Sequence, residues 1–207
     1  MKKPILFAVL WMVTTGAIAG ATKQPGIDDQ QSEQKGTSAP VSAGPKKEMN
    51  LLYPRIGTWH VTIRTEPSKV SPRGGVDKGV MTMKRGPGGF SVVQEFWSRG
   101  TSGNVKGQSY AWWDDASKAY KSVWCDNMQG CTEFVTVING RSWSVEFNSE
   151  AEGKKVHTVI QATMSADLNA IHEEVKSSYD GGPAKLESVS EYVRVIPGAG
   201  GKPGLRP

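Results

Sequence analysis

The feature that most limits the fold of this chain is a series of short segments rich in Val, Thr, Trp, Tyr and Phe. They recur about every 10 to 13 residues with turn-forming residues between them, the pattern of antiparallel strands. The strongest helical alternative, residues 165–180, lacks an apolar stripe of 3.6-residue period. The predicted strands, about ten, are 59–65, 76–85, 90–98, 105–114, 119–125, 132–138, 141–149, 155–164, 170–179 and 187–195.

The turns between these segments predict sequential hairpins. Asn139-Gly140 and Asp180-Gly181 are dipeptides that suit tight two-residue turns. Trp143, Val145 and Phe147 alternate with polar residues, so that strand has one apolar face. A sheet of about ten sequential strands with one apolar face and no helix to cover it must curl or pair with a second sheet. We therefore predict an all-β fold, an antiparallel up-and-down β-barrel of 8 to 10 strands.

The first 21 residues have the pattern of a secretory signal peptide. Lys2 and Lys3 precede an apolar run, and an Ala-x-Ala follows at Ala17 and Ala19. The run is shorter than the roughly 20 residues that a membrane-spanning helix needs. We expect cleavage, no membrane span in the mature protein, and a periplasmic or secreted location.

Composition divides the rest of the chain into three parts. Residues 22–50 and 197–207 are rich in Gly, Pro, Ser, Gln and charge, and we expect a disordered leader and a disordered tail there. The predicted barrel domain is 51–196. Basic and acidic residues are interspersed in it and the formal net charge of the whole chain is +5, so we expect no nucleic-acid partner.

Cys125 and Cys131 flank the segment DNMQG between two predicted strands. In an oxidising compartment such a pair is expected to form a disulfide. A redox role is disfavoured because the spacing is not Cys-x-x-Cys and the site lies on a hairpin.

Several motifs together resemble a known family. They are Gly57-Thr58-Trp59, FSVVQEFW, GQSYAWWDDASKAYKSVWCD, Asp180-Gly181-Gly182 and the closing EYVRV. This pattern resembles the bacterial domain of unknown function family 1579, and there is more distant similarity to nitrobindin and fatty-acid-binding barrels. The resemblance implies a lipocalin-like, calycin-type barrel and no established activity.

A barrel of this strand number can enclose more space than its side chains fill, so we predict a small apolar or amphipathic ligand. The candidate ligand-binding residues are Trp143, on the strand with the cleanest alternation, and Tyr192 with Arg194, which could grip a carboxylate. The alternative for Tyr192 and Arg194 is a surface pair, with Val193 and Val195 facing inward.

Two other functions stay open from the sequence. One is a barrel that serves as a protein-interaction or structural module without a ligand. The other is a haem-binding, nitrobindin-like barrel, for which His157 and His172 are the late-strand candidates, although alternation directs both to solvent. The chain has no recognisable catalytic set, so we expect no enzyme, metal or cofactor, and the oligomeric state is not indicated.

Overall fold

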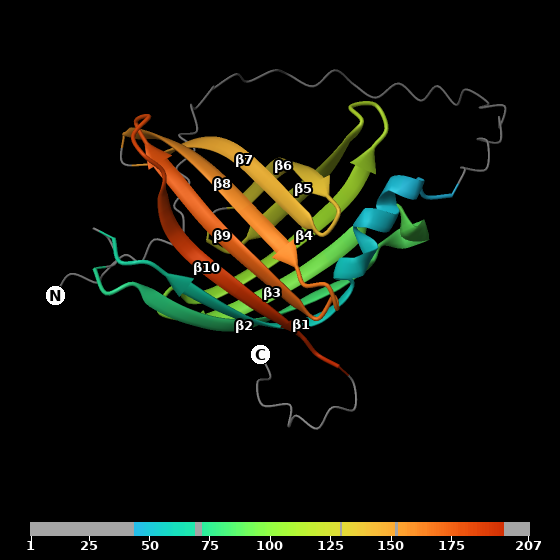
Figure 1. The fold of residues 1–207 in the computed structure, drawn as a ribbon, viewed down its shortest axis with the longest axis horizontal. Helices are drawn as coiled ribbons and strands as arrows, with labels where there is room; N and C mark the ends of the chain where they lie inside the picture. Colours follow the sequence, from blue (N-terminus) through green and yellow to red (C-terminus); the bar gives the residue numbers. More distant parts are fainter. Residues whose placement is uncertain (1–43, 69–71, 129, 152, 197–207) are drawn as a thin grey trace, which may run out of the picture.

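A computed structural model describes residues 44–68, 72–128, 130–151 and 153–196 (Figure 1). The signal peptide expected at 1–21, most of the leader expected at 22–50 and the tail expected at 197–207 lie outside the described residues. Ten strands form one closed antiparallel barrel in which each strand pairs with its neighbours along the chain and β1 closes on β10. The predicted all-β up-and-down barrel is confirmed.

The elements follow one another with short connections. Two 3₁₀ helices, η1 (Lys47–Leu51) and η2 (Tyr53–Arg55), precede the strands, and η3 (Pro87–Gly89) joins β2 to β3. The strands are β1 (Gly57–Thr65), β2 (Gly75–Arg85), β3 (Val92–Gly100), β4 (Gly103–Asp114), β5 (Ala119–Asp126), β6 (Gly130–Asn139), β7 (Ser142–Ala151), β8 (Lys154–Met164), β9 (Ala170–Tyr179) and β10 (Lys185–Arg194).

The predicted hairpin turns have the required backbone. Gly140 has a φ of 59° between β6 and β7, and Asp180 and Gly181 have φ values of 52° and 75° between β9 and β10. Tight hairpin turns need positive φ, which Gly, Asn and Asp adopt at the least cost. These turns fix the register that sends alternate side chains into the barrel.

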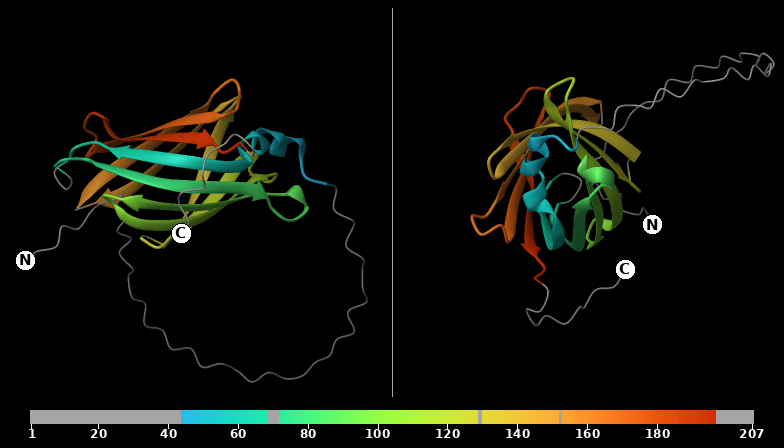
Figure 2. Two further views of the ribbon diagram at one scale, coloured as in Figure 1. Left: turned by 90° about the horizontal axis from the view of Figure 1, so that it is seen from below. Right: turned by 90° about the vertical axis from the view of Figure 1, so that its right-hand side faces the viewer.

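The two helices cover one end of the barrel, here named the closed end (Figure 2). Met49 of η1 and the adjoining Leu52 are 2% exposed and pack with Val92 and Tyr120. The Tyr120 hydroxyl donates a 2.8 Å hydrogen bond to the Glu48 carbonyl. The folded part therefore begins before residue 51, and the leader boundary expected at residue 50 is corrected: burial of Met49 offsets the cost of ordering this segment.

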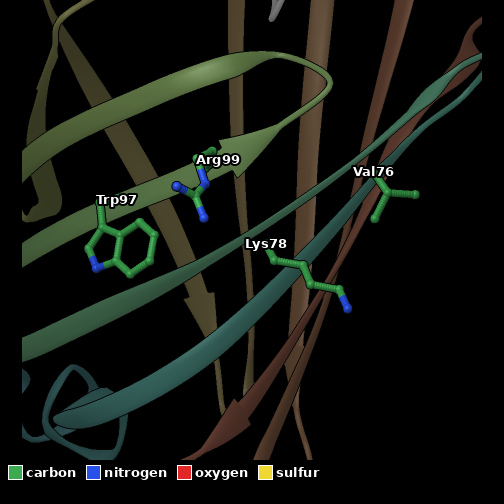
Figure 3. A pocket seen from close by; sticks show the side chains of 4 residues that line it. All are labelled: Val76, Lys78, Trp97 and Arg99. Carbon is green, nitrogen blue, oxygen red and sulfur yellow. The ribbon is translucent and has the colours of Figure 1, made fainter. Parts of the chain in front are cut away.

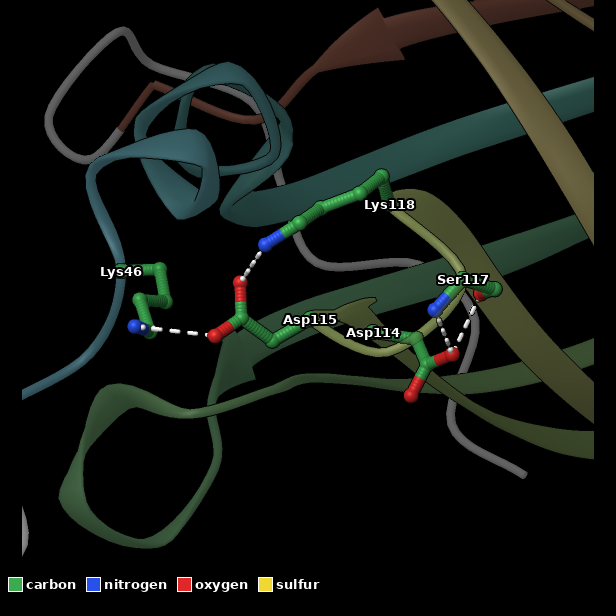
Figure 4. Close-up of polar contacts among 5 residues, drawn as sticks. All are labelled: Lys46, Asp114, Asp115, Ser117 and Lys118. Carbon is green, nitrogen blue, oxygen red and sulfur yellow. Dashed lines mark hydrogen bonds and ion pairs between the residues drawn. The ribbon is translucent and has the colours of Figure 1, made fainter.

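Polar contacts hold the approach to η1 against the turn between β4 and β5 (Figure 4). The Asp115 carboxylate forms ion pairs with Lys118 at 2.7 Å and with Lys46 at 3.0 Å. The neighbouring Asp114 accepts hydrogen bonds from the backbone N–H and the hydroxyl of Ser117. These interactions lower the pKa of each aspartate to about 2, chiefly through Lys118 for Asp115 and Ser117 for Asp114.

Trp59 lies at the closed end with no exposed surface. The Arg194 guanidinium lies over its ring, 4.1 Å from the centroid. Gly57, at a φ of 144°, leaves room for that guanidinium, because a Cβ there would lie 2.4 Å from Arg194 Nη1. The Gly-x-Trp motif is thus explained by the passage of Arg194 across the start of β1.

The barrel wall is weakest between β6 and β7. These strands pair only from Thr136 to Asn139 with Val145 to Ser142, four positions, whereas every other neighbouring pair is matched over at least seven. In the described structure, residues 130–135 of β6 and 146–151 of β7 therefore have no ladder with each other. This unpaired region, here named the seam, runs towards the end opposite the helices, the open end.

The predicted disulfide between Cys125 and Cys131 is present. It joins directly opposed positions of β5 and β6 near the open end. The bridged part of β6 is the part that has no β7 neighbour. The disulfide therefore ties this half-supported strand to its remaining partner.

Candidate functional site

The candidate site is the interior of the barrel, here named the lumen, next to its closed end. The floor is a packed cluster of inward-facing residues, Trp59, Val61, Met81, Ala162, Met164 and Ile171. Trp143 and Tyr192 pack against this cluster and are only partly buried.

Arg55 enters the lumen from η2. Its guanidinium lies over the Trp143 ring, 3.8 Å from the centroid. Burial lowers the pKa of Arg55 to about 10, against the opposing influence of Glu173 and Tyr120, so the side chain keeps its positive charge at neutral pH. Its Nη2 atom is buried without a hydrogen-bond partner among the described residues.

Three consecutive backbone carbonyls around Arg55 are held by side chains. Arg194 donates to the Pro54 carbonyl at 2.7 Å and to the Ile56 carbonyl at 2.6 Å. Trp59 Nε1 donates to the Arg55 carbonyl at 2.9 Å. The turn that carries Arg55 is therefore fixed on both sides, which aims the guanidinium into the lumen.

Glu173 is on the inward face of β9, opposite Ala162 of β8, and its charge raises the pKa of Arg55. The Tyr192 hydroxyl, on β10, donates a 3.0 Å hydrogen bond to Glu173 Oε1. Burial raises the pKa of Glu173, and hydrogen bonds from Tyr192 and Ser190 oppose this rise. Burial also raises the pKa of Tyr192 well above its usual range, so the phenol stays a donor.

Aromatic side chains line the lumen beyond this polar group. Trp124, Phe134 and Phe147 share the inward face of β5, β6 and β7, since they oppose the inward residues Ser109, Ser122 and Thr158. Each keeps part of its surface exposed although it points into the barrel. Apolar side chains that face inward and still contact solvent indicate unfilled interior space, in contrast to the packed floor.

The Phe134 and Phe147 rings flank the seam, with centroids 5.4 Å apart. Trp124 lies over Gly107, where a Cβ would be 2.2 Å from its ring, and its Nε1 donates to Asp126 at 2.6 Å. The aromatic wall is thus fixed on the β5 side and adjoins the unpaired strands on the other.

Two hollows lie on the outer wall rather than in the lumen. One, of about 250 Å³, is lined by Val76, Lys78, Trp97 and Arg99 of β2 and β3 (Figure 3). A second, of about 500 Å³, lies over β3 to β5 and is open to solvent. Both lack the buried charge and unused donor of the lumen, so we place the candidate site in the lumen.

The structure brings together two of the three residues predicted for ligand binding. Trp143 and Tyr192 both face the lumen next to Arg55 and Glu173. Val193 is 57% exposed, so the surface-pair alternative, with Val193 inward, is wrong for Tyr192. Arg194 lies at the closed end with its N–H groups on the carbonyls of Leu168, Ile56 and Pro54. A direct ligand contact by Arg194 stays a prediction.

Sequence reasoning missed Arg55 and the inward role of Glu173. Arg55 precedes the first strand, where no alternation indicates its direction. The sequence does separate Glu173 from Glu174 on opposite faces, and the structure places Glu174 outside with Lys176 at 2.7 Å. The one available signal for Arg55 was a cation inside the otherwise apolar opening LLYPRIG.

The histidines considered for haem do not reach the lumen. His60, His157 and His172 are all exposed. His157 pairs with Asn148, and His172 with Glu191 at 2.7 Å. These three are all the histidines of the chain, so the lumen offers no imidazole ligand to haem iron.

Comparisons with known proteins bear on the fold alone. The chain matches no protein-family model, so membership of family 1579 is not confirmed, and it matches no curated protein sequence. Among solved structures it is similar to Rv2717c from M. tuberculosis, at 9% identity and a TM-score of 0.50, over 73% of this chain and 99% of that one. It is also similar to the S-type phycobiliprotein lyase CPES from Guillardia theta, at 9% identity and a TM-score of 0.45, over 71% and 92%.

Proposed function

We propose that this protein binds a small amphipathic molecule in the lumen of its barrel. The observation that carries the proposal is the partial exposure of inward-facing aromatic side chains above a fully packed floor. Barrels with more than about eight strands have interiors wider than their own side chains fill, and such interiors hold ligands.

The polarity of the lumen supports an amphipathic occupant. One end carries Arg55, Glu173 and Tyr192, and the walls beyond carry Trp124, Phe134 and Phe147. We propose the seam as the route of entry, because separation of the strands beside Phe134 and Phe147 breaks no ladder hydrogen bonds between them in the described structure.

We also propose that the protein acts outside the cytoplasm. The Cys125–Cys131 disulfide supports this location, because disulfides persist in oxidising compartments. The signal segment itself lies outside the described residues. Among the described residues, no helix is long and apolar enough to cross a bilayer.

The test uses N-phenyl-1-naphthylamine, a neutral fluorescent probe that does not depend on Arg55. We expect saturable binding of one probe per chain, with energy transfer from tryptophan. Val175→Phe narrows the lumen and is expected to weaken binding at least ten-fold. The matched control, Val193→Phe, changes an exposed position on the outer wall and is expected to bind as the parent does.

The outcomes are distinct. Absence of saturable binding by the parent protein overturns the proposal. Equal binding by both valine variants places the probe outside the lumen and also overturns it. Circular dichroism checks the folding of each variant. Should Val175→Phe not fold, Ile160→Phe on the neighbouring strand narrows the same layer and replaces it.

A second function is supported by the outer wall. Val135 and Val137 on β6 are 54% and 64% exposed, and Tyr110 on β4 is 43% exposed. Val135 and Val137 are two residues apart on the outer face of β6, and clustered exposed apolar side chains are typical of protein-interaction surfaces. This interaction module becomes the preferred function if no small molecule binds.

A further inference from the structure

The strongest unexplained feature of the lumen is the unused donor atom of Arg55. Its Nη2 is buried and has no hydrogen-bond partner among the described residues. Buried polar groups in folded proteins are almost always hydrogen-bonded, and an unsatisfied one is costly. The missing partner of Arg55 therefore needs an explanation, and an acceptor supplied by a ligand is one.

Glu173 does not supply that partner. Its charge raises the pKa of Arg55, but none of the ion pairs among the described residues joins the two side chains. Tyr192 donates to Oε1 of Glu173 instead. The Nη2 atom of Arg55 is thus left without an acceptor from its own chain among the described residues.

The unpaired N–H group of Arg55 indicates which class of ligand can bind beside it. A guanidinium presents its N–H groups in a planar fork that matches a carboxylate. The charge of Glu173, which acts on Arg55, opposes additional negative charge, so a head group with a single charge fits best. Trp143, stacked under the guanidinium, and the aromatic wall beyond it suit an apolar body.

We propose that Arg55 binds the carboxylate of an amphipathic acid whose apolar body extends through the lumen towards the open end. This inference rests on the proposed function and names its ligand class. The carboxylate takes the unused Nη2 of Arg55, and the arginine accordingly belongs to the site rather than to the scaffold.

The experiment compares dodecanoate with dodecanol by displacement of N-phenyl-1-naphthylamine. The parent protein is expected to bind dodecanoate at least ten-fold more tightly than dodecanol, since a charge-assisted hydrogen bond strengthens binding by about that factor or more. Arg55→Met is expected to reduce dodecanoate affinity to the level of dodecanol and to leave dodecanol affinity within about two-fold.

Arg85→Met is the matched control. Arg85 lies at the same end of the barrel and stacks on Tyr53, 3.8 Å from the ring centroid, but it is exposed. The control is expected to keep the parent's preference for the acid. A loss of that preference in both arginine variants would mean that general positive charge, not Arg55, selects the acid.

The inference and the proposed function fail differently. If neither dodecyl compound displaces the probe and the probe itself does not bind, the proposed function fails. If both compounds displace it equally from the parent, or Arg55→Met keeps the preference, the function stands and the carboxylate site is overturned.

A second measurement does not depend on a variant. The carboxyl carbon of [1-¹³C]dodecanoate bound to the parent protein is followed by NMR as the pH is changed. An ion pair with Arg55 is expected to keep the bound carboxylate ionised at lower pH than a carboxylate bound at the apolar wall. If the pKa of the bound carboxylate is equal to or higher than that of dodecanoic acid in water, the proposal is overturned.

Discussion

Arg194→Ala is the substitution whose effect on stability the structure predicts most sharply. Nε donates to the Leu168 carbonyl at 2.8 Å, Nη1 to the Ile56 carbonyl at 2.6 Å and Nη2 to the Pro54 carbonyl at 2.7 Å. From the alternation of β10 alone, the Arg194 side chain is predicted to be exposed, and its removal to leave the fold intact. The structure instead shows a clasp that joins β10, the β8–β9 connection and η2.

The size of the effect follows from these contacts. Hydrogen bonds to a charged group contribute roughly 1.5 to 3 kcal/mol each when buried, but the Arg194 side chain is only partly buried, so about 1 kcal/mol each is appropriate. The stacking on Trp59 contributes roughly 0.5 to 1 kcal/mol more. Arg194→Ala should therefore lower the free energy of unfolding by about 3.5 to 4 kcal/mol.

Urea unfolding followed by tryptophan fluorescence measures this loss. With a slope of about 2 kcal/mol per molar urea, the midpoint should fall by roughly 1.8 to 2 M. Arg194→Lys keeps the charge but not the fork of donors, so it should recover less than half of the loss. Arg99→Ala, at an exposed arginine of β3, is the control and should stay within about 0.5 kcal/mol of the parent. If Arg194→Ala lowers the free energy of unfolding by less than about 1 kcal/mol, the stabilising role given to these three hydrogen bonds is refuted.

Three further predictions concern the disulfide and two surface charges. Cys125→Ser should lower the free energy of unfolding by about 2 kcal/mol, as expected for so short a loop, and speed hydrogen exchange at residues 130–135, measured by NMR. Because the pKa of Asp115 is lowered to about 2, its stabilisation is present above about pH 4 and is lost as the pH falls towards 2; Asp115→Asn should flatten this part of an acid-unfolding curve. The hydrogen bond to Glu191 raises the pKa of His172, so its stabilisation is present below about pH 6.5 and is lost as the pH rises through the higher folded-state value; His172→Gln should remove that dependence.

The barrel was predictable because its signals are local. Alternation of Trp143, Val145 and Phe147 identifies one strand, and Asn139-Gly140 identifies the turn before it. Such patterns repeat along the chain with short connections, so strand number and order follow without knowledge of distant contacts. The short β6–β7 ladder was not predictable, because the alternation of both strands continues beyond the point where they separate.

The direction of β10 shows where alternation fails. Val193 and Val195 are more apolar than Tyr192 and Arg194 and so suit an interior better, yet Val193 and Val195 are 57% and 37% exposed. The lumen at this level is polar, since it holds Glu173, and Tyr192 faces inward to donate to it. The alternation of polar and apolar residues identifies the inward face of a strand only where the interior beside it is apolar.

Arg55 could not be found by periodicity, because its place depends on closure of the whole barrel. It lies on a 3₁₀ turn before β1, and the residues that fix this turn or receive its side chain are Trp59, Trp143 and Arg194. Two of them are more than 80 positions away in the chain. Only contacts made after folding bring the cation into the lumen.

The two arginines should therefore be coupled in binding as well as in space. Arg194 fixes the carbonyls on either side of Arg55, so it is a positioning residue for the carboxylate site. In folded protein at low temperature, Arg194→Ala should weaken dodecanoate binding several-fold and leave dodecanol binding unchanged. In the Arg55→Met background the same substitution should have no effect on either compound, because the group it positions is gone. This double-mutant cycle separates positioning from general loosening of the closed end, since loosening would lower the affinity for dodecanol too and would persist without Arg55.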